Sequence, residues 1–440
     1  MNPKPIGVGL LGLGVVGSGV VQILRDRSDA LARDHEFHLD IRRVAVRDTG
    51  KARSVDVAPD ILTDDPASVI EDPNIQIVIE VIGGLEPART LCLSALRAGK
   101  DVVTANKALI AEHGDELFQA AYANDAGFSF EASVCGGIPI IRSLTQGLAA
   151  NRIGSLYGIL NGTTNYILTK MSDEGGSFDE ILERAQGLGF AEADPTMDID
   201  GTDAAQKLSI LCRLAFGAVV PYAQILRDGI NQITPLDIEY ARNLGYAIKL
   251  LGIARDTGDH IEARVHPTLV RTDTLLANIK DEFNAVEVVG DAVGPQVYCG
   301  RGAGSLPTAS AIVSDLIEQA DRRITGRQRI SRRVVEARAV APIPKDRIRT
   351  SYYCRFTVQD TPGVLAEIAQ IFSQHTISIA TVIQQGRSEE EGGTVPLIMT
   401  THDACEADMQ QAIDQIGGLI AVKEPPQVLR IESFKEQQSE

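Results

Sequence analysis

The sequence PIGVGLLGLGVVG, residues 5–17, predicts how the N-terminal part of the chain folds. Residues 5–11 are almost entirely apolar or glycine, as in a buried β-strand, and a helical pattern, VVQILRDR, follows the turn. Between them, Gly12, Gly14 and Gly17 have the GxGxxG spacing. The first glycine makes the turn, the second lets the backbone approach a pyrophosphate, and the third lets the helix pack on the strand. This context favours a dinucleotide site, with the anion at the helix N-terminus, over a glycine-rich turn in an unrelated α/β fold.

The end of the second expected strand indicates which dinucleotide is bound. In IRRVAVRD, residues 41–48, Arg47 stands where a site for NAD usually carries an acidic residue on the ribose 2′-hydroxyl. An arginine there suits a 2′-phosphate, with Lys51 and Arg53 as further cations. We therefore expect NADP(H), and leave use of NAD(H) open.

Further strand–helix units follow the dinucleotide motif. IQIVIEVIGG (75–84) is an expected strand, EPARTLCLSALRAGK (86–100) a helix, and DVVTANKALI (101–110) a strand with Lys107 near its end. Ligands collect at the carboxyl ends of parallel strands, so Lys107 is expected to touch both nicotinamide and substrate. The alternative is a lysine that only begins the next helix. The chain is expected to leave this domain near residue 135.

An acidic stretch, GLGFAEADPTMDIDGTDAAQKLSIL, occupies residues 187–211. Asp203 and Lys207 share one helix face because they are four residues apart, and leucines supply the apolar stripe of the same helix. Repulsion among the carboxylates predicts an ammonium ligand between them, and burial is expected to lower the pKa of Lys207 for proton exchange. The alternative is a solvated acidic loop with a surface ion pair. The five carboxylates expected to converge belong to Glu192, Asp194, Asp198, Asp200 and Asp203.

Composition limits the classes of partner. The chain has 440 residues, enough for several domains, and its net charge of −17 argues against nucleic acid as a ligand. The six cysteines form no CxxC pair and are expected to be reduced thiols, which suits the cytoplasm. No export signal is expected at the N-terminus and no membrane span elsewhere.

The rest of the chain is expected to form two more regions. A more antiparallel part contains a polar turn, Asn161 to Asn165, whose side chains cap a helix or line a pocket. GRGAGSLPTASAIVSDL (300–316) is a second glycine-rich loop that feeds a helix, which is expected to close the nucleotide domain. In EARVHPTLV, Pro267 suits an edge strand. After a proline-containing linker, the chain is expected to form a βαββαβ module of its own.

These motifs together resemble the homoserine dehydrogenase family over almost the whole chain. The matching segments are GLGVVG (12–17), TANK (104–107), NGTTNYIL (161–168), GFAEADPTMDIDGTDAAQKL (189–208) and GAGSLPTAS (302–310). The C-terminal module, with RFTVQDTPGVLAEIAQIF, is similar to an ACT domain. The implied fold is α/β, and its parts are a Rossmann dinucleotide-binding domain (1–135 plus 300–340), an α+β catalytic and dimerisation domain (136–299), a linker (341–350) and a ferredoxin-like ACT regulatory domain (351–430).

The resemblance implies a reversible, NADP(H)-dependent reduction of L-aspartate 4-semialdehyde to L-homoserine, in threonine and methionine biosynthesis. It also implies feedback by threonine at the ACT domain, a homodimer or homotetramer, and a sodium ion. Lys207 is the implied acid–base catalyst and Lys107 a second catalytic lysine. The implied substrate-binding residues are Glu192, Asp198, Asp203, Gly162 and Thr163. The implied cofactor-binding residues are Gly12, Leu13, Gly14, Val15, Val16, Gly17, Arg47, Lys107 and Gly304. The implied sodium ligands are the Glu131 side chain and the carbonyls of Val134, Gly136 and Ile138, with Cys135 where a smaller residue is common.

Two other functions stay open from the sequence. One is another NADP-dependent amino-acid or semialdehyde dehydrogenase on the same scaffold. The other is a metabolite sensor without catalysis, in which the nucleotide site reports redox state and the ACT domain reports an amino acid. The acidic stretch and the two lysines favour an enzyme with an aminated substrate.

Overall fold

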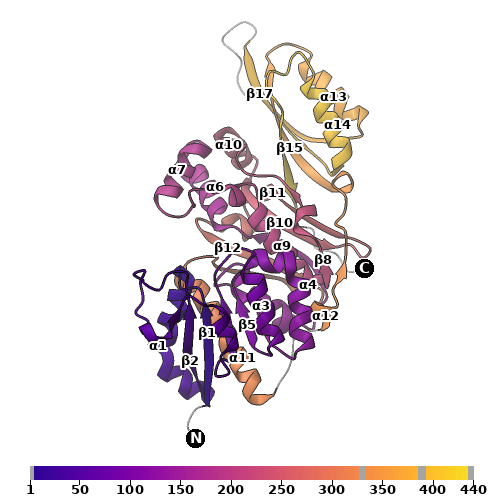
Figure 1. Ribbon diagram of the computed structural model, residues 1–440. Coiled ribbons are helices and arrows are strands. Elements are labelled where there is room, and N and C mark those ends of the chain that lie inside the picture. The colour runs from indigo at the N-terminus through magenta and orange to yellow at the C-terminus, as the bar shows by residue number, and fades with distance from the viewer. Residues whose placement is uncertain (1–3, 327–331, 385–392, 435–440) are drawn as a thin grey trace.

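The computed structural model describes residues 4–326, 332–384 and 393–434. The predicted ranges 1–135, 300–340 and 351–430 each include a few residues outside this description. The chain forms three parts in a row (Figure 1), with the indigo N-terminal strands at one end and the C-terminal module, in yellow, at the other. The site described below lies in and beside the middle part.

The N-terminal part is a parallel sheet with the strand order β3-β2-β1-β4-β5-β6. This order, with β1 near the centre, is that of a Rossmann fold, so the predicted fold class is confirmed. Apolar residues of β1 and β2 form the core beneath helix α1. The strands are β1 (Lys4–Leu11), β2 (Phe37–Ala45), β3 (Leu62–Thr63), β4 (Ile77–Glu80), β5 (Asp101–Thr104) and β6 (Phe128–Ser129), and the helices are α1 (Val15–His35), α2 (Ala67–Glu71), α3 (Ala88–Arg97) and α4 (Lys107–Ala123).

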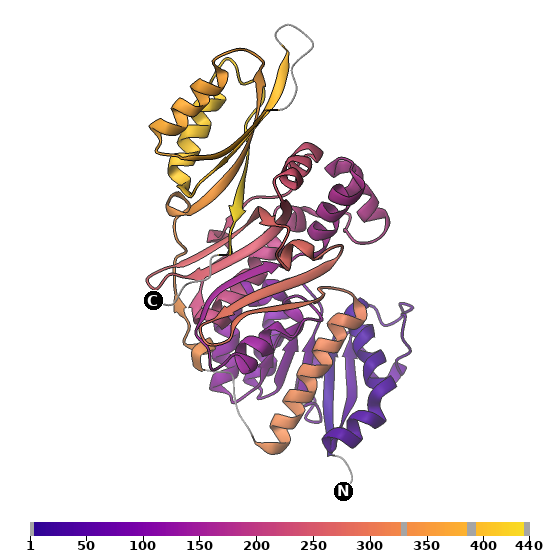
Figure 2. The same cartoon turned by 180° about the vertical axis from the view of Figure 1, so that it is seen from behind.

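Helix α11 (Ser305–Thr325) returns to this part from far along the chain. It packs on α1, where the Ser305 hydroxyl donates to the Val15 carbonyl at 2.8 Å. A Cβ at Gly19 would lie 3.0 Å from that of Ala309, so the glycine allows a close approach of the two helices. Figure 2 shows the orange helix α11 beside the indigo strands. The expected return of this segment is therefore present.

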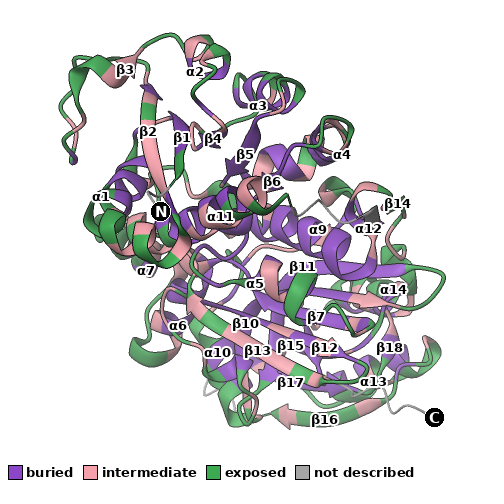
Figure 3. Ribbon diagram, turned by 90° about the horizontal axis from the view of Figure 1, so that it is seen from below, coloured by how far each residue is buried: buried purple, intermediate pink, exposed green. Residues whose placement is uncertain are grey.

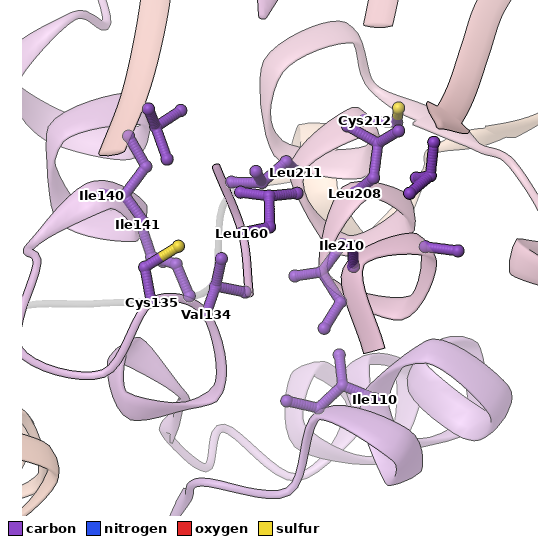
Figure 4. Close-up of a cluster of buried hydrophobic side chains, with 14 of the residues drawn as sticks. Ile110, Val134, Cys135, Ile140, Ile141, Leu160, Leu208, Ile210, Leu211 and Cys212 are labelled. Atoms are coloured by element: carbon purple, nitrogen blue, oxygen red, sulfur yellow. The ribbon is translucent and has the colours of Figure 1, made fainter. Parts of the chain in front are cut away.

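The middle part is built on antiparallel strands in the order β13-β12-β7-β10-β11, as expected. Helix α9 (Thr202–Phe216) lies between α4 and β10 and is buried along nearly its whole length (Figure 3). Figure 4 shows part of the core around it, with Ile110 of α4 facing Ile210 of α9 and Leu160 beside Leu211. The strands are β7 (Ile153–Ile159), β10 (Tyr246–Asp256), β11 (Ile261–Arg271), β12 (Phe283–Gly290) and β13 (Gly294–Arg301), and the other helices are α6 (Gly162–Glu174), α7 (Phe178–Gly187), α8 (Thr196–Ile199) and α10 (Pro235–Asn243).

The C-terminal module has the predicted βαββαβ order, with two helices packed on one sheet. Its strand order is β19-β15-β17-β16, and a short strand, β18 (Ala404–Cys405), pairs with β15. The elements are β15 (Arg349–Gln359), α13 (Val364–Gln374), β16 (Ile379–Gln384), β17 (Thr394–Thr401), α14 (Glu406–Gly417) and β19 (Gln427–Glu432).

Strand β19 joins the module to the middle part. It pairs antiparallel with β15 and parallel with Thr268 to Val270 of β11, so the two sheets are continuous. The sequence suggested a module with a sheet of its own, but the module shares its sheet with the middle part. Residues 341–350 also differ from a free linker, because the Ile343 amide donates to Ile261 and β15 begins at Arg349.

Pro267 does not lie in an edge strand, because β11 has partners on both sides. On the side away from β10, β11 pairs with β9 (Leu226–Arg227) through Arg264 and Val265, and with β19 from Thr268 onward. The proline falls in the gap between these two partners. Its missing amide therefore removes no ladder hydrogen bond on that side.

Candidate active site

The buried start of α9 places a carboxylate beside an ammonium group. Gly201, with φ of 80°, precedes the helix, and Asp203 and Lys207 lie one turn apart inside it. The Lys207 Nζ is 2.7 Å from an Asp203 carboxylate oxygen and donates to the Leu160 carbonyl at 2.7 Å. Only 6% of the Asp203 side chain and 11% of the Lys207 side chain are exposed. The pair is therefore not the solvated surface pair of the alternative interpretation.

Lys107 reaches the same carboxylate from the nucleotide-binding part. Lys107 is the first residue of α4, shortly after the carboxyl end of β5. It therefore begins the next helix, as the alternative interpretation of the sequence expected. Its Nζ nevertheless lies 3.2 Å from the second Asp203 oxygen, and 37% of its side chain is exposed. Asn106 fixes this helix start, because its side chain accepts from the Leu109 amide and donates to the Gly84 carbonyl. The structure thus brings both predicted lysines together on one aspartate.

Asn161 links the two carboxylates of the site. Its Nδ2 donates to Asp198 at 2.7 Å and to Asp203 at 2.8 Å, while its Oδ1 accepts from the Thr164 amide and caps α6. Of the two expected roles, the structure shows the helix cap, and lining a pocket stays a prediction. Its part in orienting Asp198 and Asp203 was not predicted, because nothing in the sequence indicates which remote side chains an N-cap asparagine contacts.

The neighbouring residues of the NGTT turn hold the surrounding loops. The Thr163 hydroxyl donates to the Phe190 carbonyl at 2.9 Å, which fixes the start of the acidic loop. A Cβ at Gly162 would lie 2.7 Å from the Glu282 carbonyl, so no larger residue fits there without movement. Both predicted residues thus lie at the edge of the site, and their contact with substrate stays a prediction.

The acidic loop does not bring five carboxylates together. Asp194 accepts from the Thr196 amide and hydroxyl, and Asp200 accepts from the corresponding groups of Thr202, so both are satisfied within their own turns. Glu192 is exposed, and its carboxylate has no partner among the described residues. The prediction of a five-carboxylate cluster was wrong, because short local turns satisfy aspartates more readily than a distant ligand does.

The charges of the cluster shift its pKa values in opposite directions. Burial lowers the pKa of Lys207, but Asp203 and Asp198 more than offset it, and the pKa lies above its ordinary value. The expected lowering was therefore wrong in sign. Burial raises the pKa of Asp203, but the two lysines and Asn161 bring it below the ordinary value. For Asp198, burial and the charge of Asp203 raise the pKa.

The glycine motif has the geometry that the sequence predicted. A Cβ at Gly17 would lie 2.3 Å from the Gly12 carbonyl, and Gly12 itself has φ of 103°. A Cβ at Gly14 would meet nothing within 4 Å, so the backbone there is open. Val15 is 71% exposed and Val16 packs on the core beneath, while the Leu13 side chain is buried. These residues fit a pyrophosphate at the N-terminus of α1.

The other predicted cofactor residues lie near this motif. Arg47 is exposed two residues beyond the end of β2. Arg53 donates to the carbonyls of Asp48, Thr49 and Lys51, so it holds its own loop. Gly304, with φ of 112°, is the N-cap of α11, and the hydroxyl of the next residue contacts the backbone of the glycine motif.

The predicted cation ligands lie in one short loop. Both Glu131 carboxylate oxygens already accept backbone amides, from Ile141 and Arg142. No donor in residues 4–326, 332–384 or 393–434 reaches the carbonyls of Val134 and Gly136, whereas the Ile138 carbonyl accepts from the Ile140 amide. Cys135, buried with φ of 55°, adopts the left-handed backbone of this loop. The described part contains no group of three His, Cys, Asp or Glu side chains that could hold a metal ion. The predicted cation ligands are mainly backbone carbonyls, which are a different kind of site.

The described part also contains no helix that is long and apolar enough to cross a membrane.

Comparisons with known proteins identify the family of these motifs. Residues 139–317 match the family model described as homoserine dehydrogenase, residues 12–131 the model homoserine dehydrogenase, NAD binding domain, and residues 352–421 the model ACT domain. The chain is 44% identical to homoserine dehydrogenase of Synechocystis sp. over 96% of this chain and 99% of that protein. It is 42% identical to homoserine dehydrogenase of Bacillus subtilis over 98% of this chain and 99% of that protein.

Solved structures agree with the sequence matches. The crystal structure of a homoserine dehydrogenase from Thiobacillus denitrificans is 44% identical, with a TM-score of 0.90, and covers 99% of this chain and 100% of its own. A hyperthermophilic archaeal homoserine dehydrogenase in complex with NADPH is 28% identical, with a TM-score of 0.61, and covers 72% of this chain and 98% of its own.

Proposed function

This chain belongs to the homoserine dehydrogenase family, and from that premise we propose how its residues reduce L-aspartate 4-semialdehyde to L-homoserine. It is an oxidoreductase with a nicotinamide-dinucleotide domain and an ACT domain. The observation that carries the proposal is the convergence of Lys107 and Lys207 on Asp203. The bound cofactor supplies or accepts the hydride, and the chain supplies orientation and the proton.

Lys207 is the proposed acid–base group. Its raised pKa keeps it an ammonium ion over the neutral range, so it can donate a proton to the oxygen that becomes the hydroxyl of homoserine. In the oxidation direction, the lysine must first lose its proton, which favours alkaline pH. Lys107 contacts the other oxygen of Asp203, and it is the proposed group that stabilises negative charge on the reacting oxygen of the substrate.

Asp198 is the proposed partner of the substrate ammonium group. The Asp203 carboxylate already has two cationic partners, so its charge is compensated. Asp198 accepts from the Asn161 amide, and no cation of the described residues pairs with it. Its charge is therefore available to an aminated substrate, with the exposed Glu192 as a second carboxylate at the entrance.

NADP(H) is the proposed cofactor, with its 2′-phosphate on Arg47. The open backbone at Gly14 and the close packing of Gly17 fit a pyrophosphate at the helix N-terminus. The NADPH complex of the archaeal relative supports the same choice. The ratio of kcat/KM for NADP⁺ and NAD⁺, measured on the native chain and on Arg47→Ala, tests the preference. A ratio that Arg47→Ala leaves unchanged would exclude this role.

We further propose a sodium ion in the loop of Glu131, Val134, Gly136 and Ile138. The unused carbonyls of Val134 and Gly136 are suitable hard oxygen ligands, and the buried Glu131 supplies negative charge. Turnover in sodium buffer compared with a buffer of a bulky organic cation tests this. Equal turnover and equal thermal stability in the two buffers would argue against the ion.

The remaining proposals concern regulation, assembly and location. Threonine is the proposed effector of the ACT domain, and the chain is proposed to form a homodimer or homotetramer in the cytoplasm. The six free thiols support a reducing compartment. Analytical ultracentrifugation measures the mass of the assembly in solution. A monomer at micromolar protein concentration would exclude the proposed homodimer or homotetramer.

The central experiment follows NADPH absorbance with aspartate semialdehyde, and NADP⁺ with homoserine, each with and without threonine. Lys207→Ala should lower kcat by about two to four decades, as expected for loss of general acid–base catalysis. The matched control is Lys170→Ala, a lysine on the surface of α6 that pairs with Glu174 and Asp281. Near-native turnover of Lys207→Ala would exclude its catalytic role. If neither substrate turns over although NADPH binds, the alternative, another semialdehyde or amino-acid dehydrogenase, is tested with a panel of substrates.

A further inference from the structure

A cavity of about 440 Å³ lies at the junction of the middle part and the C-terminal module, away from the two catalytic lysines. One wall is the segment that begins at Arg227, the last residue of the short strand β9, and ends at Ile233. The opposite walls are helix α14 and strand β19 of the module. The cavity therefore exists only where the two parts of the chain meet.

Buried charges join the two sides of this cavity. Arg430 of β19 donates to Asp228 of the middle part at 2.6 Å and to Glu406 of α14 at 2.9 Å. Tyr352 donates its hydroxyl to the same glutamate at 2.7 Å. Glu406 is 5% exposed and Arg430 is 7% exposed. This network fixes the shape of the cavity before any ligand enters.

Three charged side chains at the cavity, two of them at the edge of this network, can still bind a further partner. The Arg227 side chain lines the cavity, and its guanidinium has no hydrogen-bond or ion-pair partner in the described ranges, although its backbone pairs with β11. The Lys345 ammonium is 3.8 Å from the nearest Glu406 oxygen, and 49% of its side chain is exposed. The Asp228 carboxylate has one partner, Arg430, and 43% of its side chain is exposed. Two available cations and one available carboxylate thus face the same space, beside an apolar wall of Met409 and Ile413.

We infer that this junction cavity binds a free α-amino acid, whose carboxylate meets Arg227 and Lys345 and whose ammonium group meets Asp228. A zwitterion matches both signs of charge, and its side chain can lie on the apolar wall. The inference rests on the proposed regulation by an amino acid and deepens it by locating the site. The site lies against α14 and β19, not at the turn that begins α13.

A direct path connects this cavity to the substrate site. After Asp228, the Ile230 amide donates to the Ile199 carbonyl at 3.1 Å, and a Cβ at Gly229 would lie 2.7 Å from that oxygen. Ile199 is the last residue of α8 and follows Asp198, the proposed partner of the substrate ammonium. A ligand held by Asp228 would therefore shift α8. The expected effect is on KM for the aminated substrate rather than on KM for the cofactor.

Calorimetric titration of the full chain with each of the common L-α-amino acids tests the site without any turnover. We expect at least one to bind, and its Kd to increase about tenfold or more in Arg227→Gln/Lys345→Gln, since each charge-assisted hydrogen bond contributes about that factor. Gln410→Trp, an exposed residue of α14 at the cavity, should block binding without changing the charge. The amide and the N-acetyl form of the bound amino acid, which each lack one charge, should bind more weakly than the parent.

Arg347→Gln is the matched control, because Arg347 is exposed in the same short helix as Lys345 and does not line the cavity. It should bind the amino acid as the native chain does. Thermal melting verifies that each variant is folded. Absence of binding by any amino acid, or equal binding by the cavity variants and the native chain, would overturn the inference. Turnover of homoserine with no other amino acid present, compared between the native chain and Arg227→Gln/Lys345→Gln, tests the proposed function separately, so the two can fail independently.

Discussion

Asp203 determines the protonation of the site more than either lysine, because each of its oxygens has its own ammonium partner. The Asn161 amide adds a third contact and also holds Asp198. Removing the Asp203 charge would leave Lys207 buried without its counter-ion. Burial, which lowers the pKa of a lysine, would then dominate.

Asp203→Asn should therefore move the ascending limb of the homoserine-oxidation profile, where activity rises with pH, to lower pH by about one to three pH units. In the native chain, the raised pKa of Lys207 places this limb above the ordinary lysine range, because the catalyst must be deprotonated to accept the hydroxyl proton. Asp200→Asn, which changes an exposed carboxylate bound only to Thr202 among its described contacts, should leave the limb in place. An unchanged profile in Asp203→Asn would separate Lys207 from the titrating group.

Asp198 gives a second dependence of the same sign, on KM rather than on kcat, at lower pH. Because burial and the charge of Asp203 raise its pKa, it is protonated at higher pH than an ordinary aspartate. KM for homoserine should rise as pH falls through this raised pKa, by about tenfold for each pH unit below it, while the cofactor KM stays constant. Asp198→Asn should have a high KM that no longer depends on pH in this range. A KM that still rises toward acid in Asp198→Asn would assign this dependence to another group.

Lys249 provides a test of stability. It is buried on β10 and donates to Asn165 Oδ1 at 3.0 Å. Burial, aided by Lys280, lowers its pKa to about 8 from 10.5. Because the unfolded chain binds more protons between these values, stability should rise with pH there, by at most about 1.4 kcal/mol per pH unit. The difference in the free energy of unfolding between the native chain and Lys249→Met should follow this slope. A pH-independent difference would contradict the lowered pKa.

Sequence spacing predicted the Asp203–Lys207 pair, because residues four apart on a helix must share a face. It also proposed Lys107, from its place after a parallel strand. The contact between Lys107 and Asp203 could not be predicted, since it depends on how two domains pack. The pKa of Lys207 was predicted with the wrong sign for another reason: the apolar pattern indicated burial, but not that the charge of Asp203 would outweigh it.

The turn before α1 separates two roles of glycine within a single element. Gly17 has no room for a Cβ because the Gly12 carbonyl would lie 2.3 Å away, whereas Gly14 has open space and φ of −85°. Gly17→Ala should lower the free energy of unfolding by about 1–3 kcal/mol, the usual cost of overpacking. Gly14→Ala should leave the melting temperature of the cofactor-free protein unchanged and weaken NADPH binding by about tenfold or more.

Melting curves without cofactor and fluorescence titration with NADPH measure both effects. Equal destabilisation by the two substitutions would contradict the difference in space, and native NADPH affinity in Gly14→Ala would place the pyrophosphate elsewhere.

The glycine motif could be predicted because each glycine has a local reason. The last strand of the module was also predicted, but its second partner was not, since β19 completes the sheet of its own module and also pairs with β11. The hydrophobic pattern of one strand does not indicate how many neighbouring strands pair with it. Pro267 was misplaced on an edge for the same reason: the two short partners on that side of β11 leave a gap at the proline that no local pattern describes.

The middle part and the C-terminal module are held together by buried side chains as well as by the shared strand. Arg355 of β15 donates to Asp237 of α10 at 2.7 Å, and the Tyr353 hydroxyl donates to the same carboxylate at 3.2 Å. Asp237 is fully buried and also completes the capping box of α10 with Thr234. The carboxylate therefore depends on the C-terminal module for its only cationic partner within the described part of the chain.

Arg355→Met should destabilise the protein by about 3–5 kcal/mol, because it leaves a buried carboxylate without a counter-ion. Arg349→Met, on an exposed position of the same strand, should melt as the native chain does. The double variant Arg355→Met/Asp237→Asn should lose less than the sum of the two single variants, since the unpaired charge is gone. Because the pair joins the module to the middle part, limited proteolysis of Arg355→Met should release the C-terminal module before the rest of the chain unfolds. Native melting of Arg355→Met, or strict additivity in the cycle, would mean that the shared β19 alone joins the two parts.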